Sequence, residues 1–214
     1  MPPVTAFDVS IDLDLRGLRT LKALLTKACS HAAAATLPSA KSPNDSASLA
    51  FHVQSCTNLA VSGLGLLTGT PQEPPEWTTE GVTLEQLISL VDKTIAQLEG
   101  GATKPADLLD GVEDRELQVT YGNGQTAAWG GREYVLGYGI PNFMFHLCMA
   151  FSALRSQGVD AGKMDFLGPF MGLEEYIEDM VGEPADEPAD EPPDDDAEKK
   201  QWRGDCALVL SSRP

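Results

Sequence analysis

Apolar residues recur at three- and four-residue steps in four stretches of the chain, a spacing that places them on one face of an α-helix. The stretches run from Phe7 to about Ala35, from about Ala47 to Leu67, from Thr83 to Leu98, and from Arg132 to Gly158. Four amphipathic helices must bury their apolar faces against one another. The pattern therefore predicts an all-α fold built as a four-helix bundle.

Two of these helices carry recognisable start signals. Thr83 is followed three residues later by Gln86, which is the spacing of a capping box. The second helix follows turn-forming residues, and its cap is predicted to be Asn44, Asp45 or Ser46.

The pattern changes between the third and fourth helices. Short β-prone pieces at 117–120 and 126–129 flank Asn123-Gly124, which supplies the positive φ of a tight turn, so a small β-hairpin is predicted before the last long helix. Pro141 removes a backbone donor and clashes with the preceding turn. A kink or break is therefore predicted between Gly137 and Pro141.

Charge divides the chain into two parts. Residues 174–214 hold 14 acidic and 4 basic residues, a net charge of −10, and repeat a Glu-Pro-Ala-Asp unit with few apolar groups. We predict a helical bundle domain over residues 1–173 and an acidic, proline-rich, disordered extension over 174–214. The first part has a net charge of −7, so nucleic acid and anionic membranes are not expected as partners.

Neither the cysteines nor the N-terminus indicates export. No two cysteines form a CxxC pair, and the first residues lack the basic start and apolar run of a secretory signal. No stretch was expected to span a membrane. A cytoplasmic location is predicted. The cysteines are Cys29, Cys56, Cys148 and Cys206.

Two histidines are the candidate catalytic residues. His52 lies beside the apolar stripe of the second helix and His146 lies inside the fourth, so the two could meet across the bundle. A neutral imidazole suits proton transfer near neutral pH, with His146 as general base and His52 as its partner. The alternative is a structural core histidine that is hydrogen-bonded to a neighbour. The neighbours considered, which would also line a cleft around His146, are Asn142, Tyr138 and Gln54.

A metal centre would need a third ligand, commonly a histidine one turn along the same helix. Position 150, one turn after His146, is alanine. The residues alone therefore favour no bound cofactor, with a zinc or nickel ion on His146 and His52 as the alternative. Asp165, in the loop after the last helix, either fixes that loop or lines the mouth of the cleft.

Several motifs together carry a family resemblance. The segment PNFMFH (141–146), its approach GREYVLGYGIPNF, the exit GVDAGKMDFLG (158–168) and the opening FDVSIDLDLRGLRTLKALLTKA resemble an uncharacterised family within the DinB/YfiT-like superfamily. The resemblance covers about residues 5–170.

The resemblance implies an up-down-down-up four-helix bundle that is often dimeric. Its better-known relatives hold a metal on three histidines and act as thiol-dependent transferases, isomerases or hydrolases. His146 and His52 match two of those ligands, whereas Ala150 replaces the third. Two functions follow as hypotheses. One is a protein that binds or transforms a small molecule around His146. The other is a non-catalytic bundle that acts by association, with the acidic tail as a tether.

Overall fold

The structure is a computed structural model that describes residues 4–45, 47–75, 80–100, 109, 111–121 and 123–173. All of these residues belong to one compact unit, Met1–Gly182. The predicted acidic extension, 174–214, lies outside the described residues.

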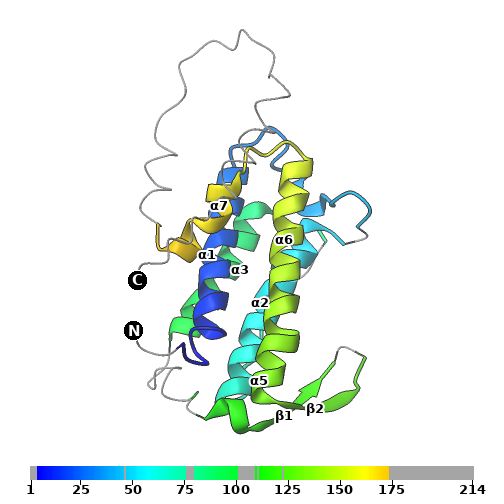
Figure 1. Ribbon diagram of the computed structural model, residues 1–214. Coiled ribbons are helices and arrows are strands. Elements are labelled where there is room, and N and C mark those ends of the chain that lie inside the picture. Colours follow the sequence, from blue (N-terminus) through cyan, green and yellow to red (C-terminus); the bar gives the residue numbers. More distant parts are fainter. Residues whose placement is uncertain are drawn as a thin grey trace, which may run out of the picture. The chain divides into compact units, whose positions relative to one another are not determined.

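Four long helices form an up-down-down-up bundle (Figure 1). Arg19 on α1 pairs with Glu99 and Lys22 with Asp92, so α3 runs antiparallel to α1. His52 lies against His146 and Cys56 against Phe143, so α6 runs antiparallel to α2. Helix α6 runs in the same direction as α1 (Figure 1). The predicted all-α bundle with a small hairpin is confirmed. The helices are α1 (Ile11–Ala28), α2 (Leu49–Thr68), α3 (Leu84–Glu99) and α6 (Ile140–Ser156).

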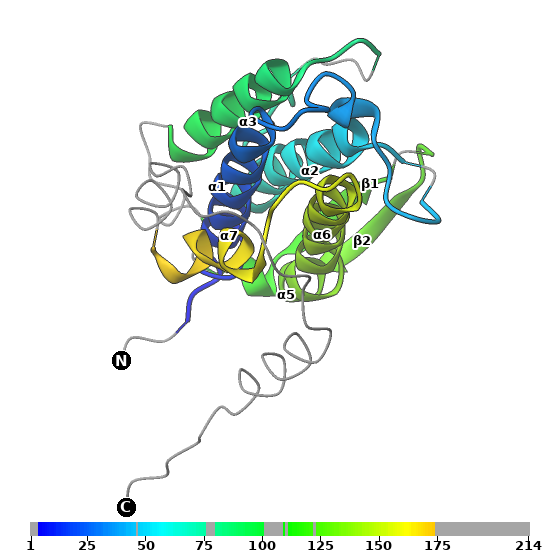
Figure 2. The same ribbon diagram turned by 90° about the horizontal axis from the view of Figure 1, so that it is seen from above.

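The core lies where these four helices meet. Seen end-on, α3 and α6 lie on opposite sides of the α1–α2 pair (Figure 2), and α6 packs mainly on α2. Gly17 permits the close approach of α1 to α6, because a Cβ there would lie 2.4 Å from the Phe143 ring. Leucine, alanine and valine dominate the buried set, which includes Ala150.

Helix ends differ from the predictions at two places. Helix α1 stops at Ala28, earlier than predicted, where the His31 Nδ1 atom accepts the Ala33 N–H at 3.2 Å and turns the chain toward a short 3₁₀ turn, η1 (Leu37–Ser39). The cap of α2 is Ser48, whose hydroxyl accepts the Phe51 N–H. The prediction of a cap at 44–46 was wrong. The capping box of Thr83 and Gln86 is confirmed.

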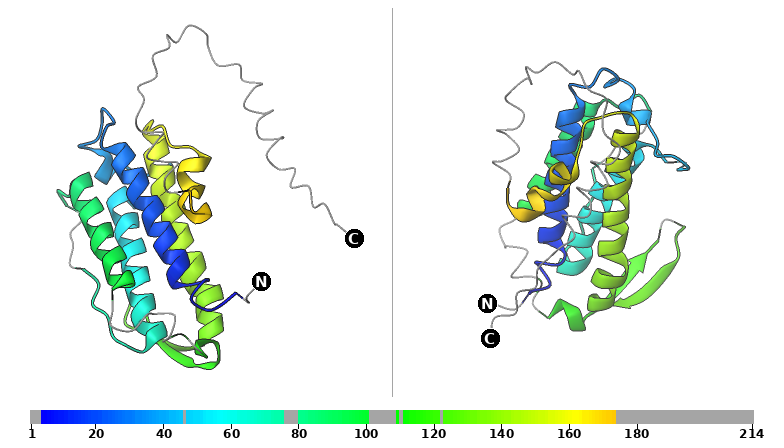
Figure 3. Two further views of the ribbon diagram at one scale, coloured as in Figure 1. Left: turned by 90° about the vertical axis from the view of Figure 1, so that its left-hand side faces the viewer. Right: turned by 45° about the horizontal axis from the view of Figure 1, so that its top comes forward.

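A two-stranded antiparallel hairpin precedes the last helix (Figure 3). After a turn η2 (Val112–Asp114), strand β1 (Glu116–Thr120) pairs with β2 (Thr126–Gly130). Trp129 Nε1 donates to the Tyr121 hydroxyl at 2.8 Å, and both rings contact Tyr138. These contacts fix the hairpin to the start of the last helix.

The last helix begins irregularly, as Pro141 predicted. A short α5 (Gly131–Tyr134) leads into a π-helical segment, η3 (Val135–Gly139), before the regular α6. By length and composition the stretch Gly131–Ser156 could cross a membrane, with 22% of its apolar window buried. Here it packs against α2 and α1 as a helix of the bundle.

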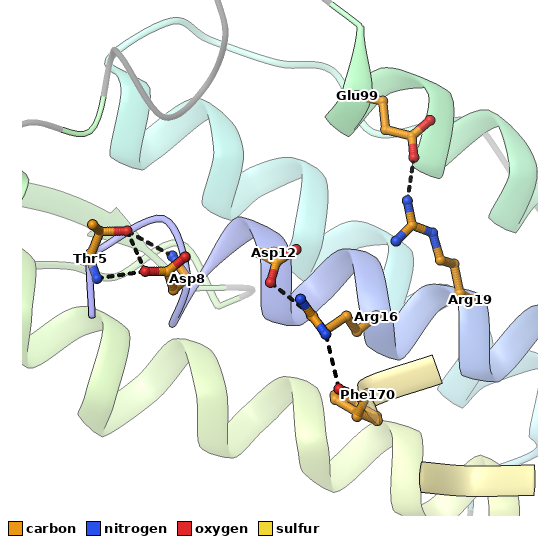
Figure 4. A network of polar contacts seen from close by, with 7 residues as sticks. All are labelled: Thr5, Asp8, Asp12, Arg16, Arg19, Glu99 and Phe170. Carbon is orange, nitrogen blue, oxygen red and sulfur yellow. Dashed lines mark hydrogen bonds and ion pairs between the residues drawn. The ribbon is translucent and has the colours of Figure 1, made fainter. Parts of the chain in front are cut away.

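The segment after α6 returns along α1. It contains α7 (Lys163–Leu167) and a 3₁₀ turn, η4 (Pro169–Met171). Arg16 on α1 donates to Asp12 at 2.7 Å and to the carbonyl of Phe170 at 2.9 Å (Figure 4). The segment is therefore attached to the bundle by polar contacts.

Candidate functional site

A hydrogen-bonded chain of three side chains joins the loop before α2 to α2 and α6. The Asp45 Oδ2 atom lies 2.9 Å from His52 Nε2, and His52 Nδ1 lies 2.9 Å from His146 Nδ1. The two histidines predicted from the sequence are thus brought into direct contact. Asp45 enters the site as a third member. We call these three residues the Asp–His–His chain.

Local structure explains how the Asp–His–His chain is held in place. His52 lies in the first turn of α2, whose start is fixed by Ser48. Asp45 is held by its second carboxylate oxygen, Oδ1, which accepts the Ala47 N–H at 3.0 Å. The preceding loop is attached to α6, because the Ser42 hydroxyl donates to the Met149 carbonyl at 3.3 Å. The site therefore depends on α2–α6 packing and on this loop.

The chain leads from the interior toward the surface. His52 is 1% exposed, whereas His146 is half-buried. Burial and the neighbouring His52 lower the pKa of His146 to about 4, although Asp45 acts in the opposite direction. His146 is therefore neutral at neutral pH and has a free ring nitrogen.

The hydrogen bonds determine the order of the protons. An ionised Asp45 can only accept, so His52 donates through Nε2 and presents a lone pair at Nδ1. His146 Nδ1 must then donate to His52 Nδ1, which leaves the lone pair of His146 on Nε2. The outer end of the chain is thus a hydrogen-bond acceptor and a base.

Two exposed aromatic rings lie beside the two histidines. The ring centroid of Phe51 lies 5.9 Å from that of His146, and the Phe145 centroid lies 5.2 Å away, both in edge-on arrangements. The same rings lie 5.8 and 6.3 Å from the His52 centroid. Phe51 is 42% exposed and Phe145 is 55% exposed, so the paired imidazoles contact two apolar rings that reach solvent.

The other predicted site residues lie at varying distances from His146. Asn142 is half-buried one turn before it, and buried Gln54 lies two residues after His52, on a different face of α2. Tyr138 contacts the hairpin aromatics. Asp165 accepts from Lys27 Nζ at 3.0 Å and from the Gly162 N–H, which fixes the exit loop against α1.

The Asp–His–His chain does not supply three ligands for one metal ion. Its two Nδ1 atoms lie 2.9 Å apart, a distance at which they share a hydrogen bond. Ala150 offers no donor, so two imidazole nitrogens are present where a catalytic zinc site uses three protein ligands. Among the described residues, no group of three histidine, cysteine or carboxylate side chains converges on one point.

His146 lines neither of two cavities that are formed by described residues. The larger, ≈ 870 Å³, lies between segments 4–9, 109–113 and 131–136. The smaller, ≈ 20 Å³, is lined by Ser10, Asp14 and Tyr134 beside η3. Burial raises the pKa of Asp14 to about 8, and burial together with Asp14 raises the pKa of Tyr134. His146 is half-buried and lies outside both of these cavities.

Three residues of the site were missed by sequence reasoning. Asp45 was considered only as a helix cap, Phe145 only as part of the PNFMFH motif, and Phe51 was not considered. One signal was present: each histidine of the chain directly follows a phenylalanine, as Phe51-His52 and Phe145-His146, whereas His31 follows a serine. In the structure these two Phe-His pairs meet, and each phenylalanine ring contacts both imidazoles.

The fold and the paired histidines define a class, the DinB-like helical bundles. A crystal structure of a DinB family member protein from Shewanella denitrificans is similar to this chain, with a TM-score of 0.65, 26% sequence identity, and coverage of 76% of this chain and 91% of that one. Residues 6–167 match the model of the domain of unknown function DUF1993, and the chain belongs to that family. A comparison with curated proteins returns no match.

Proposed function

We propose that this protein binds a small molecule at His146 and moves a proton to or from it through the Asp–His–His chain. The observation that carries the proposal is the pair of 2.9 Å contacts that joins Asp45, His52 and His146. A buried histidine needs one partner to be satisfied, but here the partners form an ordered chain that ends at a solvent-accessible base.

The chain suits general acid–base work for an electrostatic reason. When His146 Nε2 takes a proton, the positive charge develops near His52, whose Nε2 is bonded to the Asp45 carboxylate. His146 can pass its Nδ1 proton to His52, so the charge moves toward the carboxylate and away from the substrate. Asp45 also fixes the tautomer of His52, and His52 in turn fixes that of His146.

A neutral, flat probe tests the base directly. The protein is incubated with 5-nitrobenzisoxazole, whose ring opens when a base removes its carbon-bound proton. We expect turnover above buffer background that falls about tenfold or more in His146→Ala, since general base catalysis contributes on the order of 10²–10⁴. Asp45→Asn lowers the rate less, because the base remains but its tautomer is no longer fixed.

His31→Ala is the matched control, because His31 lies outside the chain and hydrogen-bonds to Ala33. It leaves the rate unchanged. Equal rates for wild type and His146→Ala would refute the proposal, provided that both variants give the circular dichroism spectrum of the folded bundle.

A homodimer is the assembly that we propose with this function. The stretch Gly131–Ser156 is apolar in composition with 22% of its apolar window buried, and Leu136 on η3 is 48% exposed. Sedimentation of wild type and Leu136→Glu measures the effect: we expect a dimer in the first and a monomer in the second. If wild type and Leu136→Glu are both monomers, or both dimers, there is no interface at this position.

A further inference from the structure

The exposed phenylalanines of the described residues are concentrated at one place. Among the large apolar side chains with high exposure, the two phenylalanines are Phe51 and Phe145. They come from α2 and α6, and both rings contact the His146 imidazole. Single exposed apolar residues are common, but two exposed aromatic rings that contact the same base form a surface for a ligand.

The polar part of this surface accepts hydrogen bonds. The proton order of the Asp–His–His chain leaves a lone pair on His146 Nε2, and the Asp45 carboxylate behind it polarises both imidazoles in the same direction. A ligand that donates N–H therefore fits the outer end of the chain, whereas a ligand that only accepts does not.

Charge favours a cation at the same place. Asp45 is the anion of the Asp–His–His chain, and residues 1–173 have a formal net charge of −7. Such a field attracts cations and repels anions. Aromatic ring faces also attract cations, by about 0.5–1 kcal/mol at an exposed site.

We propose that Phe51, Phe145 and His146 form a binding site for a small organic ammonium ion. Its N–H donates to His146 Nε2, and its apolar part lies against the two rings. The inference rests on the proposed function, because it uses the same base, and it names the class of molecule on which that base acts.

Three probes of the same shape and different charge test the inference. Benzylammonium, benzyl alcohol and benzoate are titrated into the full-length protein at pH 7, and the His146 ring signals are followed by NMR. We expect benzylammonium to shift these signals and to bind at least about tenfold more tightly than benzoate. Trimethylbenzylammonium, which has no N–H donor, binds more weakly than benzylammonium.

Substitutions locate the site. Phe145→Ala and Phe51→Ala each weaken benzylammonium binding about two- to fivefold. Met164→Ala is the matched control, because Met164 is 42% exposed, as Phe51 is, but lies on α7, which packs on α1. It leaves the affinity unchanged.

The outcomes separate this inference from the proposed function. If benzoate binds as well as benzylammonium, or if neither phenylalanine variant alters binding, the ammonium site is refuted. The nitrobenzisoxazole rate still decides the proposed function in that case, because that substrate is neutral and tests only the base. Rings covered by a second copy of the chain would also block benzylammonium, and that result overturns the inference.

Discussion

Two polar sites between the helices of the bundle are stabilised in different ways. Between α2 and α6, His52 is 1% exposed and both of its ring nitrogens have partners. Near η3, no hydrogen bond or ion pair of the Asp14 carboxylate is found among the described residues, and Asp14 faces a cavity of ≈ 20 Å³. Hydrogen bonds stabilise the histidines at the first site. At the second site the Asp14 carboxyl avoids a buried charge by remaining protonated.

This difference shows how each site withstands burial. A buried charge is tolerated when partners replace the water that it loses, and otherwise its pKa moves until it is neutral. The pKa of Asp14 is raised to about 8, so its carboxyl is mostly neutral at pH 7. The Asp–His–His chain can keep an ionised carboxylate because His52 donates to it.

Removing His52, the central residue of the Asp–His–His chain, should lower the free energy of unfolding the most. His52→Ala leaves Asp45 without its imidazole donor and His146 without its acceptor, so we expect a loss of about 2–4 kcal/mol in the free energy of unfolding. Urea denaturation measures it. His146→Ala, at the half-buried end, serves as the comparison and loses about 1 kcal/mol or less. Equal losses would mean that the two histidines do not differ in burial as the structure shows.

Replacing Asp14 should stabilise the protein, whereas replacing His52 destabilises it. Its pKa is raised from 3.8 to about 8 in the folded state, so between these values the unfolded state binds fewer protons and stability falls as pH rises. Asp14→Asn should therefore be more stable than wild type at pH 7, by about 1–3 kcal/mol. The gain disappears toward pH 4. Thermal melts at several pH values test this, and a variant that is less stable at pH 7 would show that Asp14 has a favourable ionic partner.

His146 should make the protein less stable as the pH falls below 6.5. Its pKa is lowered from 6.5 to about 4, so between these values the unfolded state binds more protons than the folded state. Stability is present above pH 6.5 and is lost as pH falls toward 4. His146→Phe should reduce this dependence. Denaturation midpoints from pH 7 to pH 4 give the slope, and identical slopes for wild type and variant would exclude the lowered pKa.

Surface ion pairs on α1 should contribute least to the free energy of unfolding. Lys22 Nζ lies 2.7 Å from Asp92 Oδ1, but both side chains are 46% exposed, so water and salt screen the pair. We expect Lys22→Ala to change the free energy of unfolding by about 0.5 kcal/mol or less, and the change to vanish in 1 M salt. A larger effect that persists in salt would show that the pair is not screened.

The sequence predicted the helices and the hairpin because those elements follow from local patterns. Apolar periodicity, the Thr83–Gln86 box and Asn123-Gly124 each act within a few residues. The ends of the helices were less predictable from the sequence. Helix α1 was expected to continue to about Ala35, but His31 hydrogen-bonds to the local backbone instead, and helical periodicity does not reveal that competition.

The site was predictable in part. His52 and His146 lie on helices whose pairing the bundle determines, so their meeting could be anticipated. Asp45 could not be assigned in this way, because its role depends on how the loop before α2 folds back. That loop is fixed by a contact between Ser42 and Met149, 107 residues apart. A polar residue next to a helix start is also the usual signature of a cap, so the local signal favoured the wrong role.

The order of protons along the Asp–His–His chain is the central claim, and ¹⁵N NMR of labelled histidines tests it most directly. At pH 7 we predict that His146 is protonated on Nδ1 and free on Nε2, that His52 has the opposite tautomer, and that a coupling connects their Nδ1 atoms across the hydrogen bond. Two histidines with the same tautomer and no such coupling would contradict the chain and the function proposed from it.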